Sequence, residues 1–496
     1  MASDPVRDVV QSMMAGTISR RDFVLRLSAA GLSMTAIGGL LAACASPGTT
    51  TTGSKPWATD PKSLTGTVKL YKGPFAANEP ALQQAYIDSF KSVAPNVTVQ
   101  FSAFDWTQAT AQMTAALASG SQDVIYIPEV FYGAFPWSTG PLENLEPWVQ
   151  DPAFVTLTQN FLPGYATRPK PTAPGGILGG VAWIDGAQAM IFVNLDLLAK
   201  AGVDPAKFNT SYDTMTEAAQ KVQALGLPGK YGIGMRENGT KNFGQFEWYG
   251  YMLRAGTDFL SPDQTKPAVN TPEFAAALQM IQDWHIKLKV MPTFGKYDWP
   301  GIRGQFIAGN IAILLDEPEF TGVINSNKPP VTFKWDVAKY PPGPKADVML
   351  GNAGLWVMSN KSQNKQAAWE VIKHWTTPNV AYDQATGVDP IISDWQAKGF
   401  WATNPYGAKI QNFLQYTHGP ILNPKLQQMI SIVMPYMDRV YAGSMTPQDA
   451  LSQASTQIQD ILLGRKGKDA LTSAGEAMGA SRMELLLRPR THSFMG

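Results

Sequence analysis

The sequence predicts an α/β protein with two bodies and a helical C-terminal part. Short apolar segments of strand length alternate with helix-length amphipathic segments, first over residues 67–128 and again from residue 189 onward. This alternation is typical of parallel strands in a sheet that helices cover. The 496 residues, of which 44% are hydrophobic and 16% charged, have a globular composition and suffice for about two or three domains.

The N-terminal segment has the order of an export signal. The adjacent Arg20 and Arg21 precede a stretch of seventeen residues without a charge, which ends in Leu-Ala-Ala before Cys44. The arginine pair resembles a twin-arginine signal, and the ending resembles a bacterial lipobox. These features predict a signal peptide over 1–43, a lipid anchor on Cys44 and a flexible tether over 44–61. An uncleaved transmembrane helix is the alternative, although the serines and glycines of the stretch make a poor anchor.

Three strands and two helices are predicted for the first body. A strand over 67–71 precedes a helix over 79–93, whose apolar residues fall on one stripe. Residues 97–102 alternate apolar and polar side chains, as in a half-buried strand. A helix over 108–117 then leads to a continuous apolar run over 123–128, which predicts a buried strand.

The second body starts with an apolar strand over 189–194. A helix over 195–200 follows, and Gly202 is placed to close it. Thr214 and Glu217 have the spacing of a capping box before an alanine-rich helix. These elements predict a second α/β unit.

Two long helices are predicted for the C-terminal half of the chain. Thr271 and Thr446 each stand before a proline, which places a capping hydroxyl ahead of a proline at the first helical position. Residues 465–496 show weak periodicity and are predicted to be an ancillary tail.

Composition and motifs exclude several classes of function. A net charge of +1 gives no electrostatic reason to expect nucleic acid, and one cysteine allows neither an intramolecular disulfide nor a cysteine-rich metal site. The histidines lack zinc-helix spacing, and no Gly-x-Ser-x-Gly elbow or phosphate-binding loop occurs. Gly232 and Gly234 begin a dinucleotide pattern that Glu237 breaks. We expect no cofactor, no metal and no catalysis; an exported carbohydrate-active enzyme with two carboxylates stays open.

Local patterns occur along the chain in an order that points to one family. They lie at residues 122–127, 191–202, 211–217, 305–313 and 351–370. In the second of them, Ile-Phe-Val-Asn-Leu-Asp-Leu-Leu-Ala-Lys-Ala-Gly is similar to a stretch usually read as Tyr-Asn-Lys-Asp-Leu-Phe-Lys-Lys-Ala-Gly. Together, behind a lipoprotein signal, these patterns resemble the family 1 extracellular solute-binding proteins of ABC transporters, to which the maltose-binding proteins belong.

The resemblance implies two α/β lobes joined by a hinge, which is the periplasmic-binding-protein-like type II fold, with a ligand cleft between the lobes. It assigns 62–186 plus 352–395 to the first lobe and 187–351 plus 396–464 to the second. It also implies an extracytoplasmic monomer, lipid-anchored to the bacterial cell membrane in the periplasm or on the cell surface. Such a protein captures a small solute, here expected to be a carbohydrate, and delivers it to the ABC permease.

The candidate site residues follow from the position of ligands in open α/β sheets, at the carboxyl ends of the strands. Carboxylates and amides suit the hydroxyl groups of a sugar, and aromatic rings suit its C–H face. The ligand-binding residues predicted at strand ends are Glu129, Tyr132, Trp183, Asp185, Asp316, Phe320, Asn352 and Asp389. The resemblance adds Trp248, which lies in a segment similar to a helix that supplies an aromatic residue in relatives.

Some of these residues have a competing structural interpretation. Glu129 could cap a helix or lie on the surface, and Trp248 could pack in the core. In the segment after Asp316, relatives commonly have Gly-Xaa-Trp. This chain has Glu319 at the position of that tryptophan, and its aromatic residue, Phe320, comes one residue later.

Other solutes are also compatible with the sequence. A polyamine would suit an acidic, aromatic-lined cleft formed by Glu129, Asp185, Asp316, Glu319 and Asp389. A lipoprotein scaffold without a small ligand is a further hypothesis.

Overall fold

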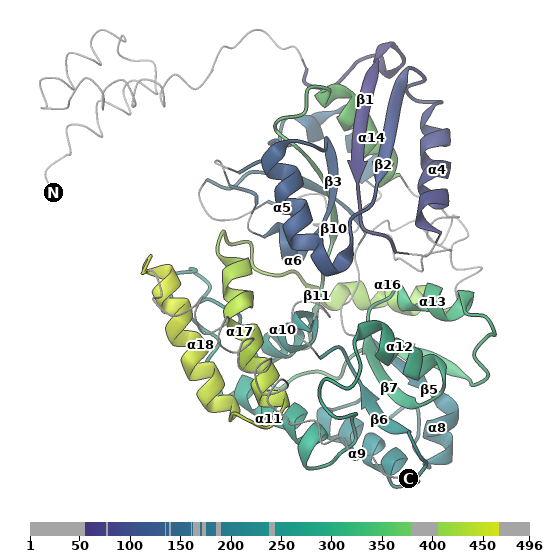
Figure 1. The fold of residues 1–496 in the computed structure, drawn as a ribbon, viewed down its shortest axis with the longest axis vertical. Helices are drawn as coiled ribbons and strands as arrows, with labels where there is room; N and C mark the ends of the chain where they lie inside the picture. Colours follow the sequence, from purple (N-terminus) through teal and green to yellow (C-terminus); the bar gives the residue numbers. More distant parts are fainter. Residues whose placement is uncertain are drawn as a thin grey trace, which may run out of the picture. The chain divides into compact units, whose positions relative to one another are not determined.

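The structure is a computed structural model that describes residues 55–75, 78–133, 135–137, 140–159, 161, 169–170, 175–184, 190–237, 244–377 and 405–465. This part of the chain contains two mixed β-sheets with helices packed on them and a set of C-terminal helices (Figure 1). The predicted signal peptide, with Arg20 and Arg21, lies outside the described residues, as do Cys44 and the tail beyond Arg465. Within the described ranges, no helix is both long and apolar enough to cross a membrane.

The first sheet has five strands in the order β2-β1-β3-β10-β4. The strands are β1 (Gly66–Tyr71), β2 (Val97–Ser102), β3 (Val124–Pro128), β4 (Gly180–Ile184) and β10 (Gly354–Met358). The predicted strands of the first body are confirmed, and β1 pairs in parallel with both β2 and β3. The expected parallel pairing thus holds for these three strands, whereas β10, from far along the chain, joins the same sheet antiparallel to β3 and β4.

Helices of the first sheet follow the predicted stripes. They are α4 (Glu79–Phe90), α5 (Ala109–Ser119), α6 (Glu129–Tyr132), α7 (Pro152–Thr158) and α14 (Lys365–Thr376). Helix α14 contacts β1 and β10. Its Trp375 packs against Tyr86 and Phe90 of α4, and its Trp369 packs against Trp148 and Phe154. Figure 1 labels both helices beside the first sheet. The helix over 108–117 is likewise confirmed, and Gly120 ends it with φ of 68°.

The second sheet has the order β6-β7-β5-β8. Its strands are β5 (Met190–Asn194), β6 (Tyr231–Gly234), β7 (Ile311–Asp316) and β8 (Trp335–Ala338). Strands β6 and β7 run parallel, whereas β5 is antiparallel to β7 and β8. Its associated helices are α8 (Leu195–Lys200), α9 (Tyr212–Gln223), α12 (Trp299–Ile307), α13 (Phe320–Ser326) and α16 (Gly407–Phe413).

The start of α9 differs from the prediction. Ser211, not Thr214, is the capping residue: the Ser211 hydroxyl accepts from the Thr214 amide at 3.1 Å, and the Thr214 hydroxyl accepts from the Ser211 amide at 3.0 Å. The backbone is still extended at Ser211, so Thr214 already lies inside the helix. The predicted box between Thr214 and Glu217 is therefore wrong by three residues.

The remaining helices of the described residues are α10 and the helices of the C-terminal part. They are α10 (Gln245–Arg254), α11 (Pro272–Ile286), α17 (Leu426–Tyr441) and α18 (Pro447–Leu462). Thr271 and Thr446 cap α11 and α18 as predicted, each accepting a backbone N–H. Short elements complete the described part of the fold: β9 (Met349–Leu350) pairs with β11 (Thr417–His418), and three-residue 3₁₀ helices lie at Pro61–Ser63, Trp106–Gln108, Trp148–Gln150 and Leu414–Tyr416.

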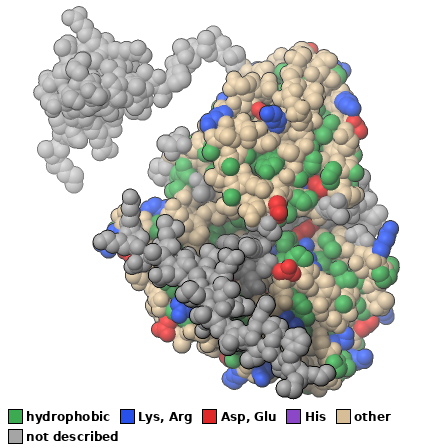
Figure 2. All heavy atoms as spheres, in the orientation of Figure 1, with side chains coloured by type: hydrophobic (Ala, Val, Ile, Leu, Met, Phe, Trp, Pro, Cys, Tyr) green, Lys and Arg blue, Asp and Glu red, His purple; other side chains and the backbone are tan. Residues whose placement is uncertain are grey.

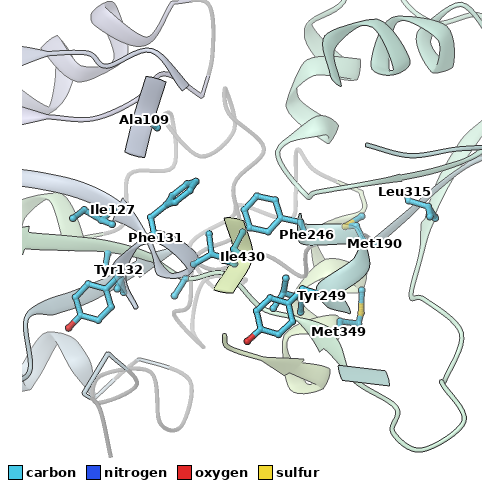
Figure 3. Packing of buried hydrophobic residues seen from close by; sticks show 14 of the residues in the cluster. Ala109, Ile127, Phe131, Tyr132, Met190, Phe246, Tyr249, Leu315, Met349 and Ile430 are labelled. Carbon is cyan, nitrogen blue, oxygen red and sulfur yellow. The ribbon is translucent and has the colours of Figure 1, made fainter. Parts of the chain in front are cut away.

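One hydrophobic cluster includes residues of both sheets and of the C-terminal helices. In Figure 3 it runs from Ile127 through Phe131, Ile430 and Phe246 to Leu315. A direct hydrogen bond also links the C-terminal helices to α6, which follows β3, since the Gln427 side chain donates to the Val130 carbonyl at 2.6 Å. The chain passes from the first sheet to the second between β4 and β5 and returns before β10.

Substitutions at two separate glycines test the packing of α9 on β6. A Cβ at Gly232 would lie 2.5 Å from the Ala219 carbonyl oxygen and 2.6 Å from its Cα, and this backbone cannot yield without moving α9. We expect Gly232→Ala to lower the free energy of unfolding by about 1–3 kcal/mol. Gly304→Ala, at an exposed position of α12 with no atom within 4 Å, should instead raise it by roughly 1 kcal/mol. Urea unfolding of both variants measures the difference, and equal stability would contradict this packing.

Candidate functional site

Parallel strands bring the polar residues of the first sheet to one edge. Strands β1, β2 and β3 all run the same way, so the residues that follow them meet at their carboxyl ends. Lys72 follows β1, Trp106 lies beyond β2, and Glu129 follows β3 directly. Because β10 is antiparallel to β3, its amino-terminal end, preceded by Asn352, lies at the same edge.

Lys72 is a fully buried cation at this edge. Its ammonium group donates to the Glu79 carboxylate at 2.8 Å and to the Gly73 carbonyl at 2.7 Å. The same nitrogen lies 3.7 Å from the centre of the Phe75 ring. Burial lowers the pKa of Lys72 to about 8, although Glu79 opposes the shift, so the ion pair remains charged below that pH.

Aromatic rings surround the Lys72 ammonium. Phe75 and Trp106 are stacked with a centroid distance of 5.9 Å, and the Trp106 indole N–H donates to the Pro74 carbonyl at 2.6 Å. Tyr126 and Trp183 lie behind them, each within 6 Å of the ammonium nitrogen. Phe75 and Trp106 are half-buried, whereas Tyr126 and Trp183 are buried. The ring surfaces that remain partly exposed therefore belong to Phe75 and Trp106.

Glu129 and Asn352 join β3 to the returning strand. The Glu129 amide donates to the Ala353 carbonyl at 2.8 Å, and the Ala353 amide donates back to the Glu129 carboxylate at 3.2 Å. The Val130 amide donates to the Asn352 side chain at 3.0 Å. Glu129 is buried, which excludes the surface position considered above. The structure thus brings these two predicted residues together at the strand ends.

Tyr132 has a clear structural role. Its hydroxyl donates to the Pro169 carbonyl at 2.7 Å and accepts from the Gly179 amide at 3.0 Å. Burial raises its pKa well above the usual value, so the hydroxyl stays protonated. A ligand contact of Tyr132 stays a prediction. Asp185 and Asp389 lie outside the described residues.

The second sheet collects charged residues at one edge in the same way. Strands β6 and β7 are parallel, and Arg236 and Glu237 follow the first while Glu317 and Glu319 follow the second. Asp316 is the last residue of β7.

Arg303 of α12 organises the carboxylates after β7. Its guanidinium group holds Asp316 through two hydrogen bonds, at 2.8 and 2.6 Å, and reaches Glu319 at 2.8 Å. Asp316 also accepts from the Trp299 indole at 3.3 Å and from the Glu317 amide at 2.8 Å, and it is fully buried. Asp316 therefore supports the neighbouring side chains, and its own ligand contact stays a prediction.

Arg236 lies deeper and is less completely bonded. Its Nε donates to Glu247 at 3.1 Å, and Nη1 lies 3.3 Å from a Glu317 oxygen. Among the described residues, the terminal nitrogens of Arg236 and the Glu247 Oε2 atom have no hydrogen-bond partner, although Nη1 is ion-paired with Glu317. Burial raises the pKa of Glu247 to about 7 despite the opposing charge of Arg236.

Phe320 and Trp248 are both buried. Phe320 packs against Phe192 at a centroid distance of 5.0 Å, and Trp248 packs against Phe259 at 5.7 Å. Their proposed contacts with a solute stay predictions. The partly exposed aromatic residue beside Asp316 is instead Trp299, which the sequence analysis missed. Its signal was the Asp-Trp-Pro start of α12, where Asp298 caps the helix.

Three carboxylates come close enough together to suggest a metal site. Oxygens of Asp316, Glu317 and Glu319 lie within 4.8 Å of one another. However, the Arg303 guanidinium lies within ion-pair distance of all three. A cation of the protein therefore already pairs with all three carboxyl groups, and the arrangement does not require a metal ion.

Glu237 and His285 form a second buried acid–base pair near the end of β6. His285 Nδ1 must donate its hydrogen to the Pro292 carbonyl at 3.0 Å, so in the neutral ring Nε2 is an acceptor facing Glu237 at 3.5 Å. Burial raises the pKa of Glu237 to about 8 and lowers that of His285 to about 4. Between these values the carboxyl group keeps the proton and the imidazole is neutral.

This pair predicts a pH dependence of stability. An unfolded Glu releases its proton near pH ~4.3. Folded Glu237 holds its proton up to about pH 8, so its stabilising contribution is complete below the unfolded pKa and is lost as pH rises through the folded one. We expect Glu237→Gln to reduce the fall in the free energy of unfolding between pH 5 and 8, which is at most about 1.4 kcal/mol per pH unit for one group.

Urea unfolding of wild type and variant across this pH range measures the change. Glu217→Gln, on the exposed face of α9, makes the same chemical change in solvent and is the matched control. If the free energy of unfolding of Glu237→Gln changes with pH as steeply as that of the wild type, the assignment of the proton to Glu237 is contradicted.

Comparison with known proteins agrees with this architecture. The profile of the bacterial extracellular solute-binding proteins matches residues 73–382. The sn-glycerol-3-phosphate-binding periplasmic protein UgpB of Pectobacterium atrosepticum is 25% identical over 285 residues, which are 53% of this chain and 62% of that protein. The chain thus spans less than two thirds of the length of this curated relative.

Solved structures show the same fold. Maltose-bound MalE3 of T. maritima is 21% identical with a TM-score of 0.68, over 80% of this chain and 99% of that one. An ABC transporter solute-binding protein from Thermotoga lettingae, bound with α-D-tagatose, is 21% identical with a TM-score of 0.69, over 80% of this chain and 100% of that one. The two sheets correspond to the two lobes of this fold. The chain therefore belongs to the family of bacterial extracellular solute-binding proteins and has their two-lobe α/β fold.

Proposed function

We propose that this protein is the extracytoplasmic solute-binding component of an ABC importer, which captures a carbohydrate between its lobes and delivers it to the permease. The observation that carries the proposal is the pair of strand-end edges: each combines carboxyl groups with a partly exposed aromatic surface, Phe75 and Trp106 on one sheet and Trp299 on the other. Carboxyl groups bind sugar hydroxyls, and aromatic rings bind the C–H face. The named relatives, which bind maltose, tagatose or glycerol 3-phosphate, support a polyhydroxylated solute.

The proposed mechanism is closure of the lobes around the solute. A solute that contacts both edges favours the closed arrangement, and its affinity includes the free energy of closure. The proposed lobes are 62–186 plus 352–395 and 187–351 plus 396–464, and the strands of each sheet fall within these bounds. The proposed contacts are those predicted above, to which Phe75, Trp106 and Trp299 are added. We propose that the protein works as a monomer.

A polyamine is less well supported than a sugar. The aromatic rings at the first edge already surround the Lys72 ammonium, which would repel a second cation. At the second edge, Arg303 already pairs with the carboxylates.

A ligand screen tests this function. The purified protein is heated with sugars, polyols, sugar phosphates, amino acids and polyamines in turn. A solute at one hundred times its Kd should stabilise the folded protein by about 2.7 kcal/mol. We expect a saturable shift in Tm with at least one polyhydroxylated solute and an unchanged solute after incubation. No saturable shift with any class would contradict the proposal, and so would a shift confined to polyamines.

The proposed location is the outer face of the cytoplasmic membrane, after export through a twin-arginine signal and lipid attachment at Cys44. We expect Cys44→Ala to abolish incorporation of labelled fatty acid and to move the protein from the membrane fraction to the soluble extracytoplasmic fraction, because the thiol is the group that takes the lipid. Ser46→Ala, two residues away, is the control and should remain membrane-bound. Continued labelling of Cys44→Ala would contradict the anchor.

A further inference from the structure

We infer that α10 supports the hinge between the lobes: Arg254 and Tyr249 position the chain around the strand pair β9–β11, and closure bends the chain at Met349–Gly351. Both side chains are fully buried, so they act on the binding geometry without contact with a solute. The effect on solute affinity rests on the proposed function, whereas the position of the hinge is a property of the free protein.

The C-terminal end of α10 holds the chain that leads into β9, and α10 packs against β9 itself. The Arg254 carbonyl accepts from the amides of Lys345 and Ala346, each at 3.3 Å. A Cβ on Gly343 would lie 2.4 Å from the same carbonyl oxygen, so the chain runs directly over the end of the helix. The Arg254 Nη1 atom also lies 3.5 Å from the Val348 carbonyl. The chain up to Val348 is therefore fixed to the second lobe.

The chain that leaves β9 is fixed to the first lobe instead. The Asn352 side chain accepts from the Val130 amide at 3.0 Å, and the Ala353 amide donates to Glu129 at 3.2 Å. Three residues, Met349–Gly351, lie between the two fixed ends. Hinges are a few residues that absorb the change in backbone angles, so a change of angle between the lobes must bend the chain here.

Tyr249 holds the chain that follows β11. The Ile421 amide donates to the Tyr249 hydroxyl at 3.0 Å, and the hydroxyl donates to the Asp258 carboxylate at 2.9 Å. Asp258 is itself fixed, because it accepts from the Phe259 amide at 2.7 Å. Burial raises the pKa of Tyr249 well above its usual value, so the hydroxyl keeps the hydrogen that it donates. Figure 3 shows Tyr249 beside Met349 of β9.

The same stretch of chain lies against the first lobe on its other side. A Cβ on Gly133, at the end of α6, would lie 3.1 Å from the Ile421 carbonyl oxygen and 2.6 Å from the Leu426 side chain. The Gln427 side chain donates to the Val130 carbonyl at 2.6 Å. Ile421 is thus held by α10 through its amide and faces α6 with its carbonyl. Loss of the Tyr249 hydroxyl would free the side that belongs to the second lobe.

A residue with an unfavourable backbone conformation adds a further contact. Gln264, in the loop between α10 and α11, has φ of 56°, and its side chain accepts from Asn423 at 2.8 Å. A non-glycine residue in the left-handed region persists where its surroundings fix it. The loop after α10 is therefore held firmly enough to serve as part of the same support.

Surface charge gives no competing explanation on the face drawn in Figure 2. The coloured Lys and Arg side chains are scattered there among Asp and Glu side chains and form no patch. Such a face offers no concentrated charge that would draw one lobe toward the other. The buried contacts of α10 and α6 are the ones that fix the chain around β9 and β11.

The support affects solute affinity through the population of the correct lobe arrangement. In Tyr249→Phe the Ile421 amide loses its acceptor, so the free protein adopts several lobe arrangements, and one of them suits the solute. The apparent Kd rises in inverse proportion to the fraction of molecules in that arrangement. If about a third to a tenth of the molecules keep it, the Kd rises about threefold to tenfold.

Distances between spin labels on the two lobes test the inference directly. Cys44→Ala removes the single cysteine of the chain, and Lys91→Cys and Lys221→Cys then place labels on exposed positions of the first and second lobes. We expect a wider distribution of label distances in Tyr249→Phe than in the parent protein, without solute. The Kd is measured for whichever solute stabilises the wild type in the thermal screen, and we expect it to rise about threefold to tenfold.

Tyr436→Phe is the matched control. It makes the same chemical change in α17 and also removes one hydrogen bond, from the Gln457 side chain at 2.7 Å, but it lies between α17 and α18 and not at the hinge. We expect the distance distribution and the Kd of this control to equal those of the parent protein. The Tm of both variants shows whether their losses of stability are comparable.

A second variant moves the chain before β9 and keeps the Tyr249 hydroxyl. In Gly343→Ala the new methyl group meets the Arg254 carbonyl, so we expect the mean label distance to shift. Gly304→Ala, with no atom within 4 Å of the new methyl group, should leave the mean distance unchanged. If Gly343→Ala fails to fold, Tyr249→Phe decides the result.

The outcomes separate this inference from the proposed function. Equal distance distributions in Tyr249→Phe and Tyr436→Phe would overturn the role of Tyr249 in the hinge, whatever the Kd. A wider distribution with an unchanged Kd would overturn its role in affinity. If no solute in the screen binds, the proposed function fails, and the label distances of the free protein still decide where the hinge is held.

Discussion

The antiparallel pairing of β10 with β3 is the constraint on which the other features of this fold depend. Strand β10 comes from residues that follow the whole second sheet, yet it fills the gap between β3 and β4. All of its residues are buried, so without this pairing the backbone groups of β3 and β10 would lose their partners inside the core. The same return brings Asn352 and Ala353 to Glu129 and so builds one end of the candidate site.

The two strand-end edges handle buried charge in different ways. At the first, a single ion pair between Lys72 and Glu79 lies under aromatic rings. At the second, Arg236 and Arg303 pair with the carboxyl groups of Glu247, Asp316, Glu317 and Glu319. Buried charges are stable only when they are paired and hydrogen-bonded. Both edges therefore present paired polar groups and partly exposed ring surfaces, which suit a polyhydroxylated solute.

Local pattern predicted the elements of this fold well because each pattern acts over a few residues. Alternation of side chains identified β2, and the Thr-Pro starts of α11 and α18 identified their caps. The mixed pairing of the first sheet was missed because strand direction depends on a partner more than two hundred residues away. The cap of α9 was misplaced because Ser211 and Thr214 are both acceptable capping residues, and only the backbone conformation distinguishes them.

By itself, the sequence determined the class of fold, the order of strands and helices, the family resemblance and the segments that end at the strand edges. These depend on residue type and spacing along the chain. Only the tertiary structure decided which side chains at those edges are buried support and which keep exposed surface. Phe320 and Asp316 are buried, whereas Trp299, Phe75 and Trp106 are partly exposed. Exposure depends on which distant segments pack over a residue, and Arg236 and Arg303 meet the carboxylates of β7 only because β6 and α12 pack against that strand.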